Sequence, residues 1–134
     1  MENRKILVVE DNVLNMKLIR GIFALGKYEI IEAMDAETGI RLARDEKPIL
    51  ILMDIQLPGM DGLEATRQLK ADSDLKDIPV VALTGFAMQG DREKAIAAGC
   101  DGYLTKPVEV AEVLETVGKF TGSENDNDLG RKNG

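Results

Sequence analysis

Five polar side chains with related chemistry lie far apart in the sequence, and each follows a short apolar run. They are Glu10, Asp11, Asp54, Thr84 and Lys106. Carboxylates are oxygen ligands of the kind that Mg²⁺ prefers, and an ammonium or a hydroxyl group can bind a phosphoryl oxygen. A carboxylate can also act as the nucleophile that accepts a phosphoryl group. These residue types therefore predict Mg²⁺-assisted phosphoryl chemistry, provided that the fold brings them together.

The apolar runs that precede these residues predict buried parallel strands, because helices cover both faces of such a sheet. The runs are Ile6–Val9, Tyr28–Ile31, Ile49–Met53, Ile78–Leu83 and Gly102–Leu104. A segment with helical spacing follows each run, which indicates βαβ units with right-handed crossovers. Parallel strands end at one edge of a sheet, so we expect the five polar side chains to meet there. Asp54 follows the middle run and is the best candidate for the nucleophile.

The helical segments can be placed from their apolar spacing and their caps. Asn12 is suited to cap the first helix and Gly26 to end it. Asp35, then Asp61 or Gly62, then Asp91 begin the next three. Four residues of the first helix, Leu14, Leu18, Ile22 and Leu25, are spaced to share one apolar face. The last helix carries Val110, Val113, Leu114 and Val117.

The composition suits one soluble domain and excludes several kinds of activity. The chain has 134 residues, 44% of them hydrophobic, and a net charge of −7, which argues against a nucleic-acid surface. It has no histidine, so Ser-His-Asp and Cys-His catalysis are excluded for the chain alone. The single cysteine, Cys100, is expected to be a buried structural thiol that forms no intramolecular disulfide. No signal peptide or membrane span is visible, so we expect no membrane association and a cytoplasmic location.

Each of the candidate residues also has an ordinary structural explanation. Asp11 alone would more often be a helix cap than a ligand, and Asp54 alone could be a turn residue before Pro58. Thr84 alone is uninformative, and Lys106 before a proline is by itself only a turn signal. Their joint occurrence at the ends of successive strands makes a coincidence improbable.

Four segments of the chain together resemble the response-regulator receiver family, and the resemblance covers residues 4–120. The segments are Ile6–Asn12, Leu52–Gly62, Pro79–Gly85 and Gly102–Pro107. Further similarity, in residues 9–18 and 86–91, is to stand-alone regulators and to the receivers of phosphorelays and hybrid kinases. The resemblance implies a flavodoxin-like (βα)5 fold, an α/β sandwich with a parallel five-stranded sheet of order 2-1-3-4-5. Residues 121–134 have no apolar period and are expected to form a mobile polar tail.

The resemblance also implies a role for each site residue. Asp54 would accept a phosphoryl group from a phosphohistidine on a sensor histidine kinase or a histidine phosphotransfer protein. Asp11, Asp54 and the backbone carbonyl of Gln56 would bind Mg²⁺, for which Mn²⁺ can substitute, and Glu10 would act mainly through water. Lys106 would pair with Asp54 or its phosphoryl group, next to a cis bond to Pro107.

A switch is implied at two further positions. The Thr84 hydroxyl would move to the phosphoryl oxygen and the Tyr103 ring would turn inward, which changes the surface of the fourth helix, fifth strand and fifth helix. Members of the family often dimerise through that surface, so a monomer or a weak dimer is expected. Gln56 and Phe86 would influence the lifetime of the phosphoryl group. No output domain is expected, so the chain would be a signalling switch rather than an enzyme.

Two other classes of protein share part of this pattern of residues or of this topology. Phosphatases that form an aspartyl phosphate use similar residues. They generally carry an Asp-x-Asp pattern after the first strand, whereas this chain has Glu10 and Asp11 at that place. A flavin-binding protein of similar topology would need a phosphate-cradling loop at that place, and two carboxylates would repel the phosphate. Turnover of a small phosphate ester would favour the first class, and a yellow protein the second.

Overall fold

A computed structural model describes residues 3–24, 26–85 and 89–122. Strands and helices alternate through the whole of this part of the chain. The strands are β1 (Lys5–Val9), β2 (Glu29–Ala33), β3 (Leu50–Asp54), β4 (Val80–Thr84) and β5 (Gly102–Thr105). The helices are α1 (Val13–Phe23), α2 (Ala36–Glu46), α3 (Gly62–Ala71), α4 (Gln89–Ala98) and α5 (Val110–Thr121).

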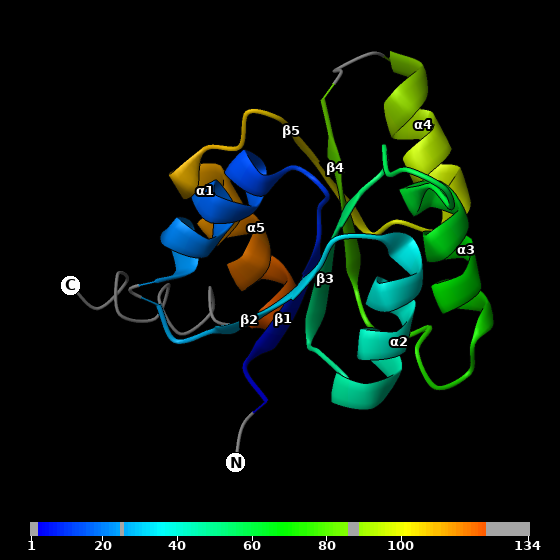
Figure 1. Ribbon diagram of the computed structural model, residues 1–134, viewed down its shortest axis with the longest axis horizontal. Helices are drawn as coiled ribbons and strands as arrows, with labels where there is room; N and C mark the ends of the chain where they lie inside the picture. Colours follow the sequence, from blue (N-terminus) through cyan, green and yellow to red (C-terminus); the bar gives the residue numbers. More distant parts are fainter. Residues whose placement is uncertain (1–2, 25, 86–88, 123–134) are drawn as a thin grey trace.

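The strands form one parallel sheet of order β2-β1-β3-β4-β5, which confirms the predicted order and places β3 in the middle. The helices α1 and α5 cover one face of this sheet, and α2, α3 and α4 cover the other (Figure 1). The interior strands β3 and β4 are buried at every position. Burial on both faces explains why these strands are continuous apolar runs rather than alternating ones.

The core on each face is mostly aliphatic, which agrees with the aromatic content of only 4% in the sequence. On one face, Met16, Ile19 and Phe23 of α1 pack with Val113 and Val117 of α5 against the sheet. On the other face, the sheet packs against small and aliphatic residues of α2 and α3. A smaller cluster beneath α4 contains Ile55, Ala82 and Ala95.

Most of the predicted caps are confirmed. The side chains of Asn12, Asp35 and Asp61 each accept a hydrogen bond from the backbone N–H three residues later, at the first turns of α1, α2 and α3. Gly99 follows α4 with a φ of +107°, in the left-handed region that glycine adopts without strain.

Three predictions about the helices were wrong. The first helix ends at Phe23 rather than at Gly26, and α4 begins at Gln89 rather than at Asp91. The apolar face predicted for α1 is not its buried face: Leu14 is 75% exposed and Leu18 is 42% exposed. The helix instead buries the neighbouring stripe of Met16, Ile19 and Phe23, and Leu25 lies outside the described residues.

Candidate phosphoryl and metal site

The parallel sheet brings the predicted site residues to one edge. Asp54 and Thr84 are the last residues of β3 and β4, and Glu10 and Asp11 directly follow β1. Lys106 directly follows β5, and its backbone N–H donates to the Thr84 carbonyl at 2.7 Å. The five residues therefore converge as the strand ends predict.

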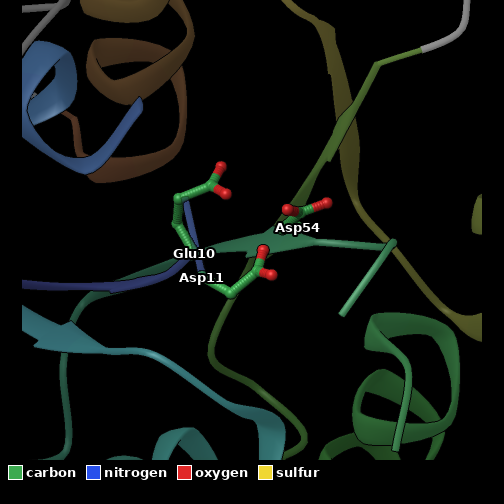
Figure 2. Close-up of side chains that lie close together, drawn as sticks. All are labelled: Glu10, Asp11 and Asp54. Carbon is green, nitrogen blue, oxygen red and sulfur yellow. The ribbon is translucent and has the colours of Figure 1, made fainter. Parts of the chain in front are cut away.

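Three carboxylates form a cluster with the donor set of a metal site. Oxygen atoms of Glu10, Asp11 and Asp54 all lie within 4.8 Å of one another. Figure 2 shows that these side chains come from the end of β1 and the end of β3. Glu10 is fully buried and Asp54 is 2% exposed, whereas Asp11 is exposed. The cluster is therefore closed on the protein side and reachable from solvent beside Asp11.

Lys106 is the positive charge that faces this cluster. Its Nζ donates a hydrogen bond to Asp54 Oδ2 at 2.9 Å and lies 2.8 Å from Glu10 Oε1. The second contact is short enough for an ion pair but lacks hydrogen-bond angles, so Glu10 Oε1 has no hydrogen-bond partner within the described ranges. The Lys106 ammonium offsets the charge of this buried oxygen, and its hydrogen-bonding capacity is left for a metal cation or a water.

The backbone after each strand orients the buried carboxylates. Asn12 N–H donates to Glu10 Oε2 at 3.0 Å, and Gln56 N–H donates to Asp54 Oδ1 at 2.9 Å. Sequence reasoning named Gln56 for its carbonyl and Asn12 for its cap, and it missed both of these N–H donors. The signal was present, because acidic side chains often accept a bond from the backbone two residues on.

The electrostatics of the site follow from its net negative charge. Burial raises the pKa of Glu10, against the lowering effects of Lys106 and the Asn12 N–H. Burial acts to lower the pKa of Lys106, but its close contacts with the charged Glu10 and Asp54 carboxylates outweigh burial, and the net shift is upward. Both shifts mean that the site holds protons tightly, as expected where carboxylates outnumber cations. The same excess charge attracts a metal cation.

The residues present fit a divalent cation with hard-oxygen preferences. The donors are carboxylate oxygens without sulfur or imidazole, which suits Mg²⁺ rather than zinc. Glu10 Oε1 is a buried oxygen without a hydrogen bond, as a site completed by a cation and its waters would leave it.

The remaining predicted residues lie at or near the same edge. Thr84 is fully buried, and Tyr103 is half-buried on β5 against the cluster beneath α4. Gln56 is exposed, and its side-chain oxygen reaches toward Gly85, where a Cβ would lie 3.6 Å from it. The Lys106–Pro107 bond is cis, as the resemblance implied. Phe86 lies outside the described residues.

Comparison with known proteins agrees with this fold. Residues 6–118 match the model of the response regulator receiver domain family. The polar-differentiation response regulator DivK of Brucella anthropi is 45% identical over 119 residues, which are 89% of this chain and 97% of the relative. The DivK of Brucella ovis is equally similar.

Solved structures of receiver domains are also similar. The receiver domain of the sensor histidine kinase PA1611 from Pseudomonas aeruginosa, with magnesium in its active-site cleft, is 36% identical with a TM-score of 0.84. The match covers 90% of this chain and 99% of that one. The receiver of Saccharomyces cerevisiae Ssk1, solved with the histidine phosphotransfer protein Ypd1, is 27% identical with a TM-score of 0.84 and covers 91% of each chain.

The chain belongs to the response regulator receiver family, and it is similar to DivK-type regulators. It is a receiver domain of two-component or phosphorelay signalling, a class of signalling switches rather than of enzymes with turnover. The phosphatase and flavin-binding alternatives are therefore not supported. No helix in the described part of the chain is long and apolar enough to cross a membrane.

Proposed function

We propose that Asp54 accepts a phosphoryl group from a phosphohistidine on a sensor kinase or a histidine phosphotransfer protein. The observation that carries this proposal is the contact between Asp54 Oδ2 and Lys106 Nζ at 2.9 Å, beside two further carboxylates at the open edge of the sheet. The Ypd1–Ssk1 complex supports the choice of donor, since a related receiver was solved there with a histidine phosphotransfer protein.

In the proposed transfer, an Asp54 carboxylate oxygen forms a bond to phosphorus while the bond from phosphorus to the histidine nitrogen breaks. The electron pair of the broken bond stays on the imidazole, and an acyl phosphate results on Asp54. The Gln56 N–H holds Oδ1 of Asp54 in place. Oδ2, once it separates from Lys106, is then the oxygen that is available to bond to phosphorus. Lys106 then compensates negative charge on the phosphoryl oxygens, and the buried Thr84 hydroxyl supplies a further donor.

Asp11, Asp54 and the Gln56 carbonyl would hold Mg²⁺ directly and Glu10 mainly through water, with Mn²⁺ as a substitute. The metal would supply Lewis-acid neutralisation of charge on the phosphoryl oxygens. The receiver would promote its own phosphorylation and, through water attack on phosphorus, its own dephosphorylation with release of inorganic phosphate. We further propose the Thr84–Tyr103 switch, a domain spanning residues 4–120, and a monomer or weak dimer through α4, β5 and α5.

The experiment that tests the proposal is intact mass measurement after incubation with acetyl phosphate and Mg²⁺. We expect one phosphoryl adduct on the native protein, and none without Mg²⁺ or on the Asp54→Asn variant. The Asp11→Asn variant is a matched control, since it removes one proposed metal ligand and keeps the nucleophile, and it should need more Mg²⁺ for the same adduct. Failure with both acetyl phosphate and a phosphohistidine donor would contradict the proposal.

A further inference from the structure

A groove lies beside β5, the strand at one end of the sheet. The helices α4 and α5 form its two walls, and they cover opposite faces of the sheet, so the groove follows the sheet's outer edge (Figure 1). Its volume is about 350 Å³. Sites for small ligands have volumes of about 300–1,000 Å³, so this groove is large enough for one small molecule.

Two aromatic rings and one aliphatic side chain form the apolar part of the groove. They are Tyr103 on β5, Phe120 on α5 and Ile96 on α4. The Phe120 ring packs on β5 at Gly102, where a Cβ would lie 3.0 Å from Phe120 Cε2. Ile96 is 58% exposed, so it has apolar surface left to cover. Aromatic rings stack favourably on flat ligands, and this part of the groove therefore suits a planar ring.

Each wall of the groove also carries one cation. Arg92 lines it from α4 and Lys119 from α5, and both residues are exposed. Within the described ranges, neither forms an ion pair. Thr116, one turn before Lys119 on the same face of α5, adds a hydroxyl donor to the lining. The groove therefore offers donors and positive charge beside its apolar part.

Asp101 lines the groove as well, but its negative charge is compensated. Lys70 Nζ lies 2.8 Å from Asp101 Oδ2, and the Val80 N–H donates to the same oxygen at 2.9 Å. The lining thus keeps a positive balance, although the whole chain has a net charge of −7. At about 0.1 M salt, charges more than about 10 Å away are largely screened, so Arg92 and Lys119 decide whether an anion binds.

We propose that this groove binds a nucleoside monophosphate, whose base lies against Tyr103 and Phe120. The guanidinium of Arg92 and the ammonium of Lys119 bind the phosphate, since a guanidinium can donate to two phosphate oxygens at once. The volume is near the lower end of the range for ligand sites, which fits one nucleotide. Among the described residues that line the groove, none belongs to the phosphoryl and metal site, so this proposal does not rest on phosphorylation of Asp54.

NMR titration of the full unphosphorylated chain with adenosine, guanosine, cytidine and uridine monophosphates tests the proposal. EDTA is present throughout, so that no divalent cation links a phosphate to the carboxylates at Asp54. With at least one nucleotide we expect saturable shifts of the Gly102, Tyr103 and Phe120 amides, without shifts at Asp11 and Asp54. The matching nucleoside, which lacks the phosphate, and ribose 5-phosphate, which lacks the base, should each bind at least about tenfold more weakly.

Three variants assign the phosphate contacts. Arg92→Met and Lys119→Met each remove one exposed cation of the groove, and each should weaken nucleotide binding by about tenfold. Lys94→Met is the matched control, because Lys94 is exposed on α4 but does not line the groove, and it should leave the affinity unchanged. The proposal would be overturned if none of the four nucleotides gave saturable shifts at the groove. It would also be overturned if the nucleoside or ribose 5-phosphate bound as tightly as the nucleotide, or if Lys94→Met weakened binding as much as Arg92→Met and Lys119→Met.

Discussion

The backbone of Gly62 lies directly against the backbone of Asp54. A Cβ on residue 62 would overlap the Asp54 carbonyl and would fall 2.7 Å from Ile55 Cα. The Gly62 N–H also donates to the Ile55 carbonyl at 3.3 Å. The start of α3 can therefore close over the end of β3 only if residue 62 has no side chain, and this closure holds the loop that carries Gln56 beside the proposed phosphoacceptor.

We expect Gly62→Ala to destabilise the protein by about 1–3 kcal/mol, the usual cost of forcing an extra carbon into a packed position. The atoms in the way belong to the backbone, so no side-chain rotation can relieve the clash. Unfolding in urea, followed by circular dichroism, would measure the loss. The variant should also accept the phosphoryl group more slowly, because the loop at Asp54 must shift.

Gly21→Ala is the matched control for this prediction. Gly21 lies within α1, and no heavy atom would lie within 4 Å of a Cβ there. Alanine favours a helix interior over glycine by about 0.5–1 kcal/mol, so this variant should be more stable than the native protein. If the two alanine variants shifted stability in the same direction, the clash at residue 62 would not be the cause of the stability change in Gly62→Ala.

The second prediction concerns the charge balance around Lys106. We expect Lys106→Met to lower the free energy of unfolding by about 3 kcal/mol in the absence of divalent cations, because it leaves two buried carboxylates uncompensated. Added Mg²⁺ should stabilise this variant more than it stabilises the native protein, since the cation no longer competes with an ammonium. Urea unfolding with EDTA and with Mg²⁺ would give both quantities.

Lys94→Met serves as the control, because Lys94 is exposed on α4 and forms no ion pair within the described residues. It should change neither the stability nor the response to Mg²⁺. An equal Mg²⁺ effect on native protein and Lys106→Met would show that the ammonium does not face the proposed metal site.

The site was predictable from the sequence because strand ends determine it. Once apolar runs are assigned to parallel strands, Glu10, Asp54 and Lys106 must reach the same edge, whatever the details of packing. The buried face of α1 was not predictable in the same way. Leu14 and Leu18 satisfy the helical period as well as Met16 and Ile19 do, and only the position of α1 on the sheet decides which stripe is covered.

The third prediction tests this assignment of the faces of α1. Ile19 is 1% exposed and Leu14 is 75% exposed on the same helix. We expect Ile19→Ala to cost about 2–5 kcal/mol of stability, from lost burial and the cavity that remains. Leu14→Ala should change stability by less than about 0.5 kcal/mol. Urea unfolding of both variants would measure these changes in stability. A larger loss of stability for Leu14→Ala than for Ile19→Ala would show that α1 buries the face predicted from periodicity.

The last prediction concerns the pH dependence of the single thiol. Cys100 is half-buried, and its Sγ lies 3.9 Å from Thr66 Oγ1 in the packing beneath α3. Burial raises the pKa of Cys100, and the hydrogen bond to Thr66 only partly opposes this.

A raised pKa means that less thiolate is present at a given pH, so alkylation should be slow at pH 8 and should accelerate only at more alkaline pH than for a free thiol. The same shift makes the folded state favour the neutral thiol, so its contribution to stability is complete below the unfolded-state pKa and is lost as the pH rises toward the folded-state value. Iodoacetamide labelling followed by intact mass would measure the rate, and the protein unfolded in urea supplies the reference. The sequence predicted a buried thiol and the structure shows a half-buried one. Labelling of the folded protein at the unfolded rate and with the unfolded pH profile would contradict a structural role for Cys100.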